Sequence, residues 1–180
     1  NTSVGSSAGA GVGFNNTDYS SNGTASHNTC IGNQAGYNKI SGKKNVFIGA
    51  FVARQSPNLG STVTMSGDRN IGIGGHSDSS EVLNSFAVFN QLSSGSNNIS
   101  IGANSGSSIT SASNNLFLGT GAGGNTTTGG GNICIKSSGG TTGTNNIFIT
   151  GGGSMTTGSK NVIIGAFNGN ENSLDIRTSS

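Results

Sequence analysis

The stretch Asn98-Ile-Ser-Ile-Gly102 decides the fold, because an asparagine opens it, two aliphatic residues alternate with a third residue, and a glycine closes it. Ten versions of this pattern follow one another along the 180 residues. They start at Asn1, Asn28, Asn45, Asn70, Asn84, Asn98, Asn115, Asn132, Asn146 and Asn161. From Asn28 onward the starts are 14 to 25 residues apart, which is too short for a helical repeat and right for one coil of a β-solenoid. We therefore expect an all-β solenoid, a single repeat domain over residues 1–180 made of stacked short strands.

The composition sets limits on the fold and on the partners. The chain has 33 Gly, one Pro, no Trp and 8% charged residues, with a formal net charge of +2. Aliphatic residues at fixed offsets favour an ordered chain over a disordered one. Because the cations are scattered and no apolar run approaches about 20 residues, we expect neither a nucleic-acid partner nor membrane insertion. The chain begins and ends inside the repeat pattern, which indicates a fragment of a longer polypeptide.

The strands are apolar on both faces. In Asn45-Val46-Phe47-Ile48-Gly49, Val46 and Ile48 point to one side and Phe47 to the other. Strands of this kind are buried on both faces. One face can be covered by the rest of its own coil, and the other needs a second chain. The pattern predicts an obligate oligomer and leaves open which face is which.

The glycines and asparagines suit the corners of a narrow coil. The closing Gly is often followed by two residues, a small residue and a second Gly, as in Gly32-Asn-Gln-Ala-Gly36. Glycine adopts a positive φ without steric cost. The opening Asn, often doubled as in Asn97-Asn98, tolerates the left-handed region and bonds to its own backbone. We expect structural roles for both, with sugar or metal binding by the asparagines as the minor alternative.

The cysteines and histidines form no recognisable site. Cys30 and Cys134 take the same middle position in copies six repeat starts apart, much farther than a disulfide can reach. We expect them to be buried, inert thiols. His27 and His76 have no Cys or His at zinc-ligand spacing.

Catalytic chemistry finds little support in the sequence. Asp78 and Glu81 are close enough to act as a glycosidase pair, although a solvated loop is the simpler interpretation. Asp68 and Asp78 bracket one repeat, but carboxylates are too sparse for a tight calcium site. No serine-hydrolase elbow or phosphate-binding loop is present. We therefore expect no enzyme activity, no cofactor and no catalytic or metal-binding residues.

An ice-binding solenoid is also disfavoured, because the threonine clusters at Thr126, Thr141 and Thr156 lack equivalents in other copies.

The pattern Asn-aliphatic-x-Ile-Gly-x-x-Ala/Ser-Gly resembles the repeats of YadA-like trimeric autotransporter adhesin heads. It is more similar still to tail-fibre proteins of tailed bacteriophages, whose repeats read much like residues 28–37 and 113–123. The segments 160–169 and 173–180 look like the part of such fibres that precedes a self-cleaving chaperone domain. The resemblance covers nearly the whole chain.

The resemblance implies a left-handed parallel β-roll in a homotrimer. It also implies a structural and receptor-binding role in a viral attachment fibre, in the virion and outside the cell. The partners would be a host surface glycan or protein receptor and other virion tail proteins. A polysaccharide-degrading tailspike and the head of a bacterial trimeric autotransporter adhesin are the alternatives.

Two steps between copies exceed one coil. Residues from about 10 to 27 and from 54 to 68 must hold a weak coil or a protruding loop, and Val12-Gly-Phe14 is a candidate for a hidden strand. Loops carry recognition in many proteins. The segments Asp18 to His27 and Arg54 to Asp68 are thus the expected receptor-binding surfaces, although no receptor-binding residue can be named.

Overall fold

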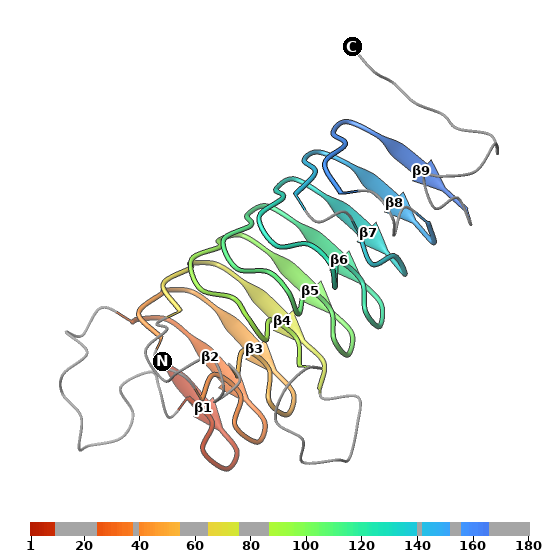
Figure 1. Cartoon of the computed structure of the whole chain (residues 1–180). Coiled ribbons are helices and arrows are strands. Elements are labelled where there is room, and N and C mark those ends of the chain that lie inside the picture. Colours follow the sequence, from red (N-terminus) through yellow and green to blue (C-terminus); the bar gives the residue numbers. More distant parts are fainter. Residues whose placement is uncertain are drawn as a thin grey trace.

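The chain folds as a stack of short parallel strands (Figure 1). The computed structural model describes residues 1–9, 25–37, 40–54, 65–75, 87–139, 142–151 and 156–165. Within them lie nine strands of three residues each, and no helix. The strands are β1 (Thr2–Val4), β2 (Thr29–Ile31), β3 (Val46–Ile48), β4 (Ile71–Ile73), β5 (Ile99–Ile101), β6 (Leu116–Leu118), β7 (Ile133–Ile135), β8 (Ile147–Ile149) and β9 (Val162–Ile164). Each strand is the three-residue centre of one Asn-opened copy, so the expected all-β architecture is confirmed.

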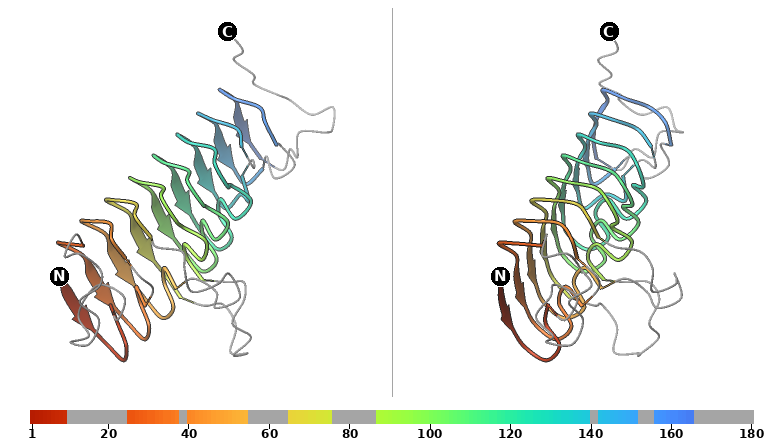
Figure 2. Two further views of the ribbon diagram at one scale, coloured as in Figure 1. Left: turned by 60° about the vertical axis from the view of Figure 1, so that its left-hand side comes forward. Right: turned by 90° about the vertical axis from the view of Figure 1, so that its left-hand side faces the viewer.

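The strands form one sheet in sequence order, and every neighbouring pair is parallel. Equivalent residues of the repeat stack directly, as Phe47 does on Cys30 and Gly72. We call one strand with the turns and loops that lead to the next strand a coil. In the right-hand view of Figure 2 the strands line one side of the stack and the connecting loops line the other.

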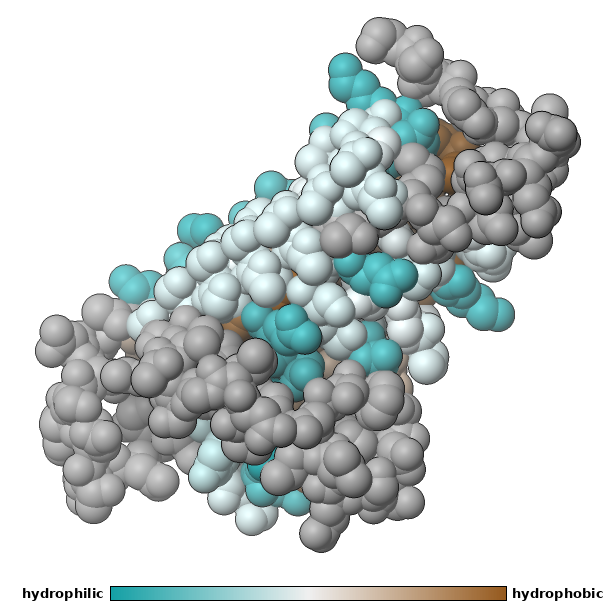
Figure 3. Space-filling view, viewed as in Figure 1, coloured by the Kyte–Doolittle hydropathy of each residue, from teal (hydrophilic) through white to brown (hydrophobic). Residues whose placement is uncertain are grey.

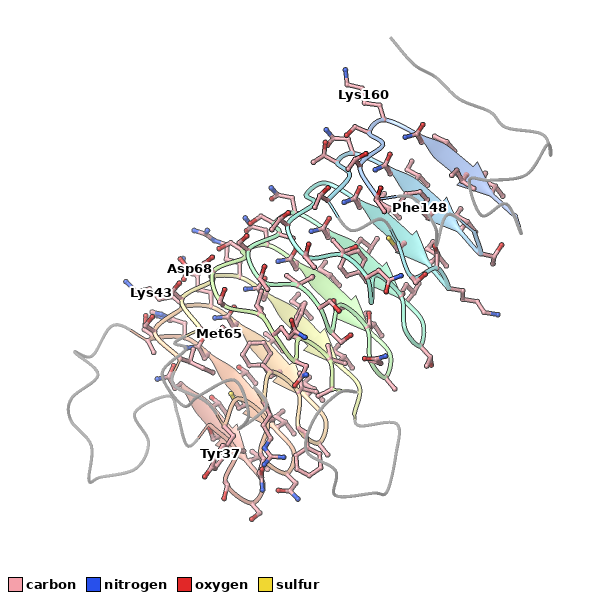
Figure 4. The ribbon with its side chains drawn as sticks, in the orientation of Figure 1. Tyr37, Lys43, Met65, Asp68, Phe148 and Lys160 are labelled. Atoms are coloured by element: carbon pink, nitrogen blue, oxygen red, sulfur yellow. The ribbon has the colours of Figure 1, made fainter. Side chains whose placement is uncertain are left out.

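The middle residue of each strand points into its own coil. Cys30, Phe47, Phe117, Cys134 and Phe148 are at most 1% exposed and belong to one continuous core. Phe148 is seen between its strand and the loops of the coil in Figure 4. The flanking aliphatic residues point outward and are only half-buried. Within one chain the coil therefore covers the middle residues and leaves the flanking ones partly exposed. Burial of this second face by another chain stays a prediction.

The core compensates locally for a missing side chain. Gly72 takes the middle position of β4, and a Cβ placed there would lie 2.8 Å from Val52 and 2.9 Å from the ring of Phe89. The Phe89 ring packs edge-on against Phe47 with centroids 6.5 Å apart. An aromatic ring from the loop side of the coil thus fills the space that a strand residue fills elsewhere.

The structure corrects the expectation of a tenth strand at Asn84 and decides what the two long steps between copies contain. β4 pairs directly with β5, so the degenerate copy at Asn84 adds no strand; Val88 instead accepts a hydrogen bond from Ala53 at a corner on the loop side. β1 likewise pairs with β2, and β3 with β4. The long steps therefore lengthen one coil each. They do not insert a further coil between these strands. Val12-Gly-Phe14 lies outside the described residues.

The glycine that closes a strand is required by its surroundings. Gly49 has a φ of 123°, and a Cβ there would lie 1.4 Å from the carbonyl oxygen of Gly74 in the next coil. A side chain at this position would push the two coils apart. The predicted role of the closing glycines is thereby confirmed where the coils are stacked most closely.

Candidate functional site

The opening asparagines form a hydrogen-bonded ladder inside the stack. The backbone N–H and Nδ2 of Asn45 donate to Oδ1 of Asn28 at 2.8 and 3.1 Å, and Nδ2 also donates to the carbonyl of Gly67 at 3.0 Å. The same backbone contact links each described opening asparagine to the previous one, from Asn1 to Asn161, and Asn98 bonds directly to Asn70. From Asn28 to Asn146 these residues are at most 2% exposed. Their amides already bond to each other, so the ladder is structural and offers no open group to a sugar or a metal.

One detail of the predicted asparagine role is wrong. The left-handed conformation belongs to the residue before the ladder asparagine, as at Asn97 (φ 59°) before Asn98 and Asn114 (φ 63°) before Asn115. The side chains of the ladder asparagines from Asn28 to Asn146 bond to neighbouring coils, and only Asn161 also donates to a carbonyl of its own coil, that of Ser159. The doubled asparagines therefore combine two roles, a left-handed corner followed by a ladder amide.

Asn98→Ala is expected to destabilise the stack. The Asn98 side chain accepts two hydrogen bonds from Asn115 and donates to Asn70 and to the carbonyl of Ala112. Removing it leaves several buried polar groups without partners, at about 4 kcal/mol in total. The matched control is Asn97→Gly, because Asn97 is exposed and Gly131 takes the same corner two coils away. Urea unfolding followed by circular dichroism should show a large drop in the midpoint for Asn98→Ala alone. Equal shifts for the two variants would contradict the ladder's role.

The outward face of the sheet is a continuous apolar surface made by the flanking residues of the strands. Its two rows are the first and third residues of each strand, in register along the stack. The rows hold Val, Ile and Leu apart from Thr2 and Thr29. Exposed fractions reach 41% at Leu118 and 65% at Ile164. Eight strand spacings of about 4.8 Å make the face about 38 Å long and on the order of 400 Å² in area. Patches of this size on a single chain are often functional.

The loop side of the stack has a different character. In Figure 3 the described surface in front of the strands is mostly pale or teal, and brown is confined to small areas. Four of the five described large hydrophobic residues that are exposed, Val4, Ile31, Leu118 and Ile164, belong instead to the strands.

A row of hydroxyl groups runs along one edge of the stack. Each member directly precedes the residue whose carbonyl accepts a hydrogen bond from a ladder asparagine, so the members are in register. All except the first are exposed: Ser41, Ser66, Ser94, Ser111, Thr128, Thr142 and Thr157. Threonine in this row is confined to the last three coils, as expected, and serine supplies the hydroxyl group in the earlier ones.

The left-handed corner before the ladder carries a basic side chain in three consecutive coils. His27, Lys44 and Arg69 have φ values of 61°, 61° and 56°, and all three are exposed. Hydrogen bonds of 2.9 Å from the Lys44 amide to Ser26 and from the Arg69 amide to Lys43 stack these corners on each other. Lys43 and Asp68 lie together at this edge, and Lys160 lies at the edge's far end (Figure 4). We call His27, Lys43, Lys44 and Arg69 the cationic corner.

Sequence reasoning missed both the hydroxyl row and the cationic corner. The signal is present once the copies are aligned on the ladder asparagine, because the corner is the residue immediately before it. Basic residues such as Lys44 and Arg69 look scattered along the sequence, because they are far apart in the chain. Stacking of adjacent coils brings them within about one strand spacing of each other.

The candidate acids are mostly outside the described residues. Asp78 and Glu81, the possible glycosidase pair, are not described, and neither is His76. Asp68 is described, and its Oδ1 accepts a hydrogen bond from the Lys43 amide at 2.7 Å. Among the described residues no three His, Cys, Asp or Glu side chains gather in a way that could hold a metal ion. The expected receptor-binding segments are described only at their ends, which include His27, Arg54 and Asp68.

Both cysteines are free and buried, as predicted. They lie in β2 and β7, five strand spacings and about 24 Å apart. The predicted separation was one spacing too large because it counted the copy at Asn84 as a strand between β4 and β5. Burial raises the pKa of Cys30 to about 11 and that of Cys134 to about 12.

The raised thiol pKa values predict a loss of stability at alkaline pH. Because both folded-state values lie above the ordinary value of 9.0, the buried neutral thiols contribute their full stability below about pH 9 and lose it as the pH rises toward 11. Thermal melts of the wild type and of Cys30→Ala/Cys134→Ala over this range are the measurement. The wild type should lose more stability above pH 9 than the double variant. Parallel curves would contradict the assignment.

Two further findings concern relationships and membranes. Within the described ranges, no helix has the length and apolarity that crossing a bilayer demands. Comparisons with protein-family models, with curated proteins and with solved structures gave no match for this chain.

Proposed function

We propose that this chain is a structural and receptor-binding part of a bacteriophage tail fibre, which attaches the virion to the host cell surface. In this proposal three copies pack as a homotrimer, each as a left-handed parallel β-roll. The trimer acts outside the cell, contacts other tail proteins, and binds a host surface glycan or protein without turning it over.

The observation that carries the proposal is the apolar outward face of the nine-stranded sheet. This face runs without interruption through every coil from β1 to β9, so it suits side-by-side packing of parallel chains along the whole stack. A threefold arrangement would bury both aliphatic rows of each chain around a common axis. The loop edges would then point outward, where a receptor can reach them.

The repeat pattern and the multiplicity support an attachment role. The Asn-aliphatic-x-Ile-Gly repeats resemble those of phage tail fibres along nearly the whole chain. Three identical loop edges on a rigid stack allow each contact to be weak, because linked sites raise the overall affinity by roughly 10²–10⁴ when they bind together.

Immunogold electron microscopy with an antibody against the chain, applied to particles and cells from the source of the sequence, tests the proposal. Gold at phage tails is the expected result. Gold on bacterial envelopes without phage would overturn the proposal in favour of an autotransporter adhesin. Release of shortened polysaccharide by the pure protein would overturn binding without turnover and bring Asp78 and Glu81 forward.

A further inference from the structure

We propose that the cationic corner, formed by His27, Lys43, Lys44 and Arg69, binds an acidic polysaccharide. This inference rests on the attachment role proposed above and names the chemistry of the receptor. The corner is exposed and is built into three consecutive coils. Its charged side chains, Lys43, Lys44 and Arg69, lie in two adjacent coils about one strand spacing, about 4.8 Å, apart, and His27 continues the row in the preceding coil.

The first argument is that cations are poor residues for this position. Side chains other than glycine and asparagine seldom adopt the left-handed conformation. In four of the five later coils the same corner holds Asn97, Asn114, Gly131 or Asn145, as the conformation favours, and an isolated lysine, Lys160, returns only in the last coil. The fold accepts asparagine or glycine at this corner, so the two adjacent cations Lys44 and Arg69 are not required by the corner conformation itself.

The second argument is the charge balance. Lys43, Lys44 and Arg69 contribute +3, and Asp68 contributes −1, which leaves +2 before any protonation of His27. Asp68 is the only carboxylate among the described residues, and one of its oxygens bonds to a backbone amide. Like charges stacked in adjacent coils repel each other, and a bound polyanion would relieve that repulsion.

The third argument identifies the polyanion as a polysaccharide. Ser41 and Ser66 of the hydroxyl row lie on the same edge, three residues before Lys44 and Arg69. A serine hydroxyl can both donate and accept hydrogen bonds, as recognition of sugar hydroxyls requires. The Ser66 hydroxyl donates to the carbonyl of Ser93 at 3.4 Å and keeps its acceptor capacity for a ligand. Single-stranded nucleic acids are instead held by aromatic side chains on which the bases stack, and positions 41–45 and 66–70 contain no Phe, Tyr or Trp.

The test compares two pairs of substitutions that remove the same charge. Lys44→Asn/Arg69→Asn restores the residue that the other corners use, so the fold should be retained. Lys136→Asn/Lys160→Asn is the matched control, since both lysines are exposed, have φ values of 50° and 60°, and lie in different coils. Circular dichroism melts of both variants establish that the stack is intact. Binding is then measured by biolayer interferometry with polygalacturonate, neutral dextran and an oligothymidylate of equal charge.

We expect the full-length protein to bind polygalacturonate in preference to both other polymers. Lys44→Asn/Arg69→Asn should lower this affinity about tenfold and the control pair less than about twofold. Equal losses in the two variants would overturn the inference, because overall charge would then explain binding. Tighter binding of the oligothymidylate would overturn it in favour of a nucleic acid. Absence of polygalacturonate binding by the folded wild type would overturn this inference alone, because electron microscopy tests the fibre role independently.

Discussion

Phe117→Asp is expected to prevent the chain from folding. Phe117 is fully buried in β6, where it stacks between Ser100 and Cys134 of the adjacent strands. The substitution removes a large core side chain, at about 3–5 kcal/mol, and leaves an unpaired charge in the interior at a further several kcal/mol. The sum is comparable with the total stability of an ordinary domain, about 5–15 kcal/mol. Circular dichroism melts and the soluble yield after refolding are the measurements.

Two controls separate the buried charge from a general effect of substitution. Phe117→Leu keeps the site apolar and should remain folded, with a loss of a few kcal/mol at most. Thr120→Asp places the same charge on an exposed residue two positions beyond the strand and should change stability by less than about 0.5 kcal/mol. Wild-type stability in Phe117→Asp would mean that the middle positions are not the core.

Ile73→Glu/Ile101→Glu is expected to abolish trimer formation. These residues are neighbours on the outward face of β4 and β5 and are half-buried in the single chain. In a monomer that functions alone, the charges would stay in water and cost little. In the proposed trimer, six carboxylates would be buried near one axis, at several kcal/mol each. Sedimentation velocity of the refolded protein should show the loss of the trimer together with the loss of folded signal.

The control for this variant is Ser111→Glu/Thr128→Glu, which adds the same charge to the exposed hydroxyl row. It should remain trimeric. A folded trimer of Ile73→Glu/Ile101→Glu, with the melting temperature of the wild type, would show that the outward face is not the interface. A stable folded monomer of the wild type would contradict the proposed assembly directly.

The repeat pattern predicted the strands well because each of the nine described strands is short and is determined by its own residues. An opening Asn, alternating aliphatic residues and a closing Gly are local signals, as at β5 and β6. The same pattern misled at Asn84-Ser-Phe-Ala-Val88. The residues there look like a strand in the sequence, but Val88 lies at a corner on the loop side of the coil. The possible catalytic pair, Asp78 and Glu81, stays a prediction because it lies outside the described residues.

The sequence by itself determined that the chain is an all-β stack and that its strands run in register. It also determined that Cys30 and Cys134 are buried and too far apart for a disulfide. These follow from spacing and from the side-chain period of two. Only the tertiary structure decided that Phe47 and Phe117 face the coil interior while Ile48 and Leu118 face outward. The tertiary structure also showed that the Phe89 ring fills the space beside Gly72, and that Lys44 and Arg69 lie on adjacent corners. The reason is physical: a repeat specifies each coil from its own residues, but the curvature of the closed coil selects the inner face, and stacking brings together side chains that are far apart along the chain.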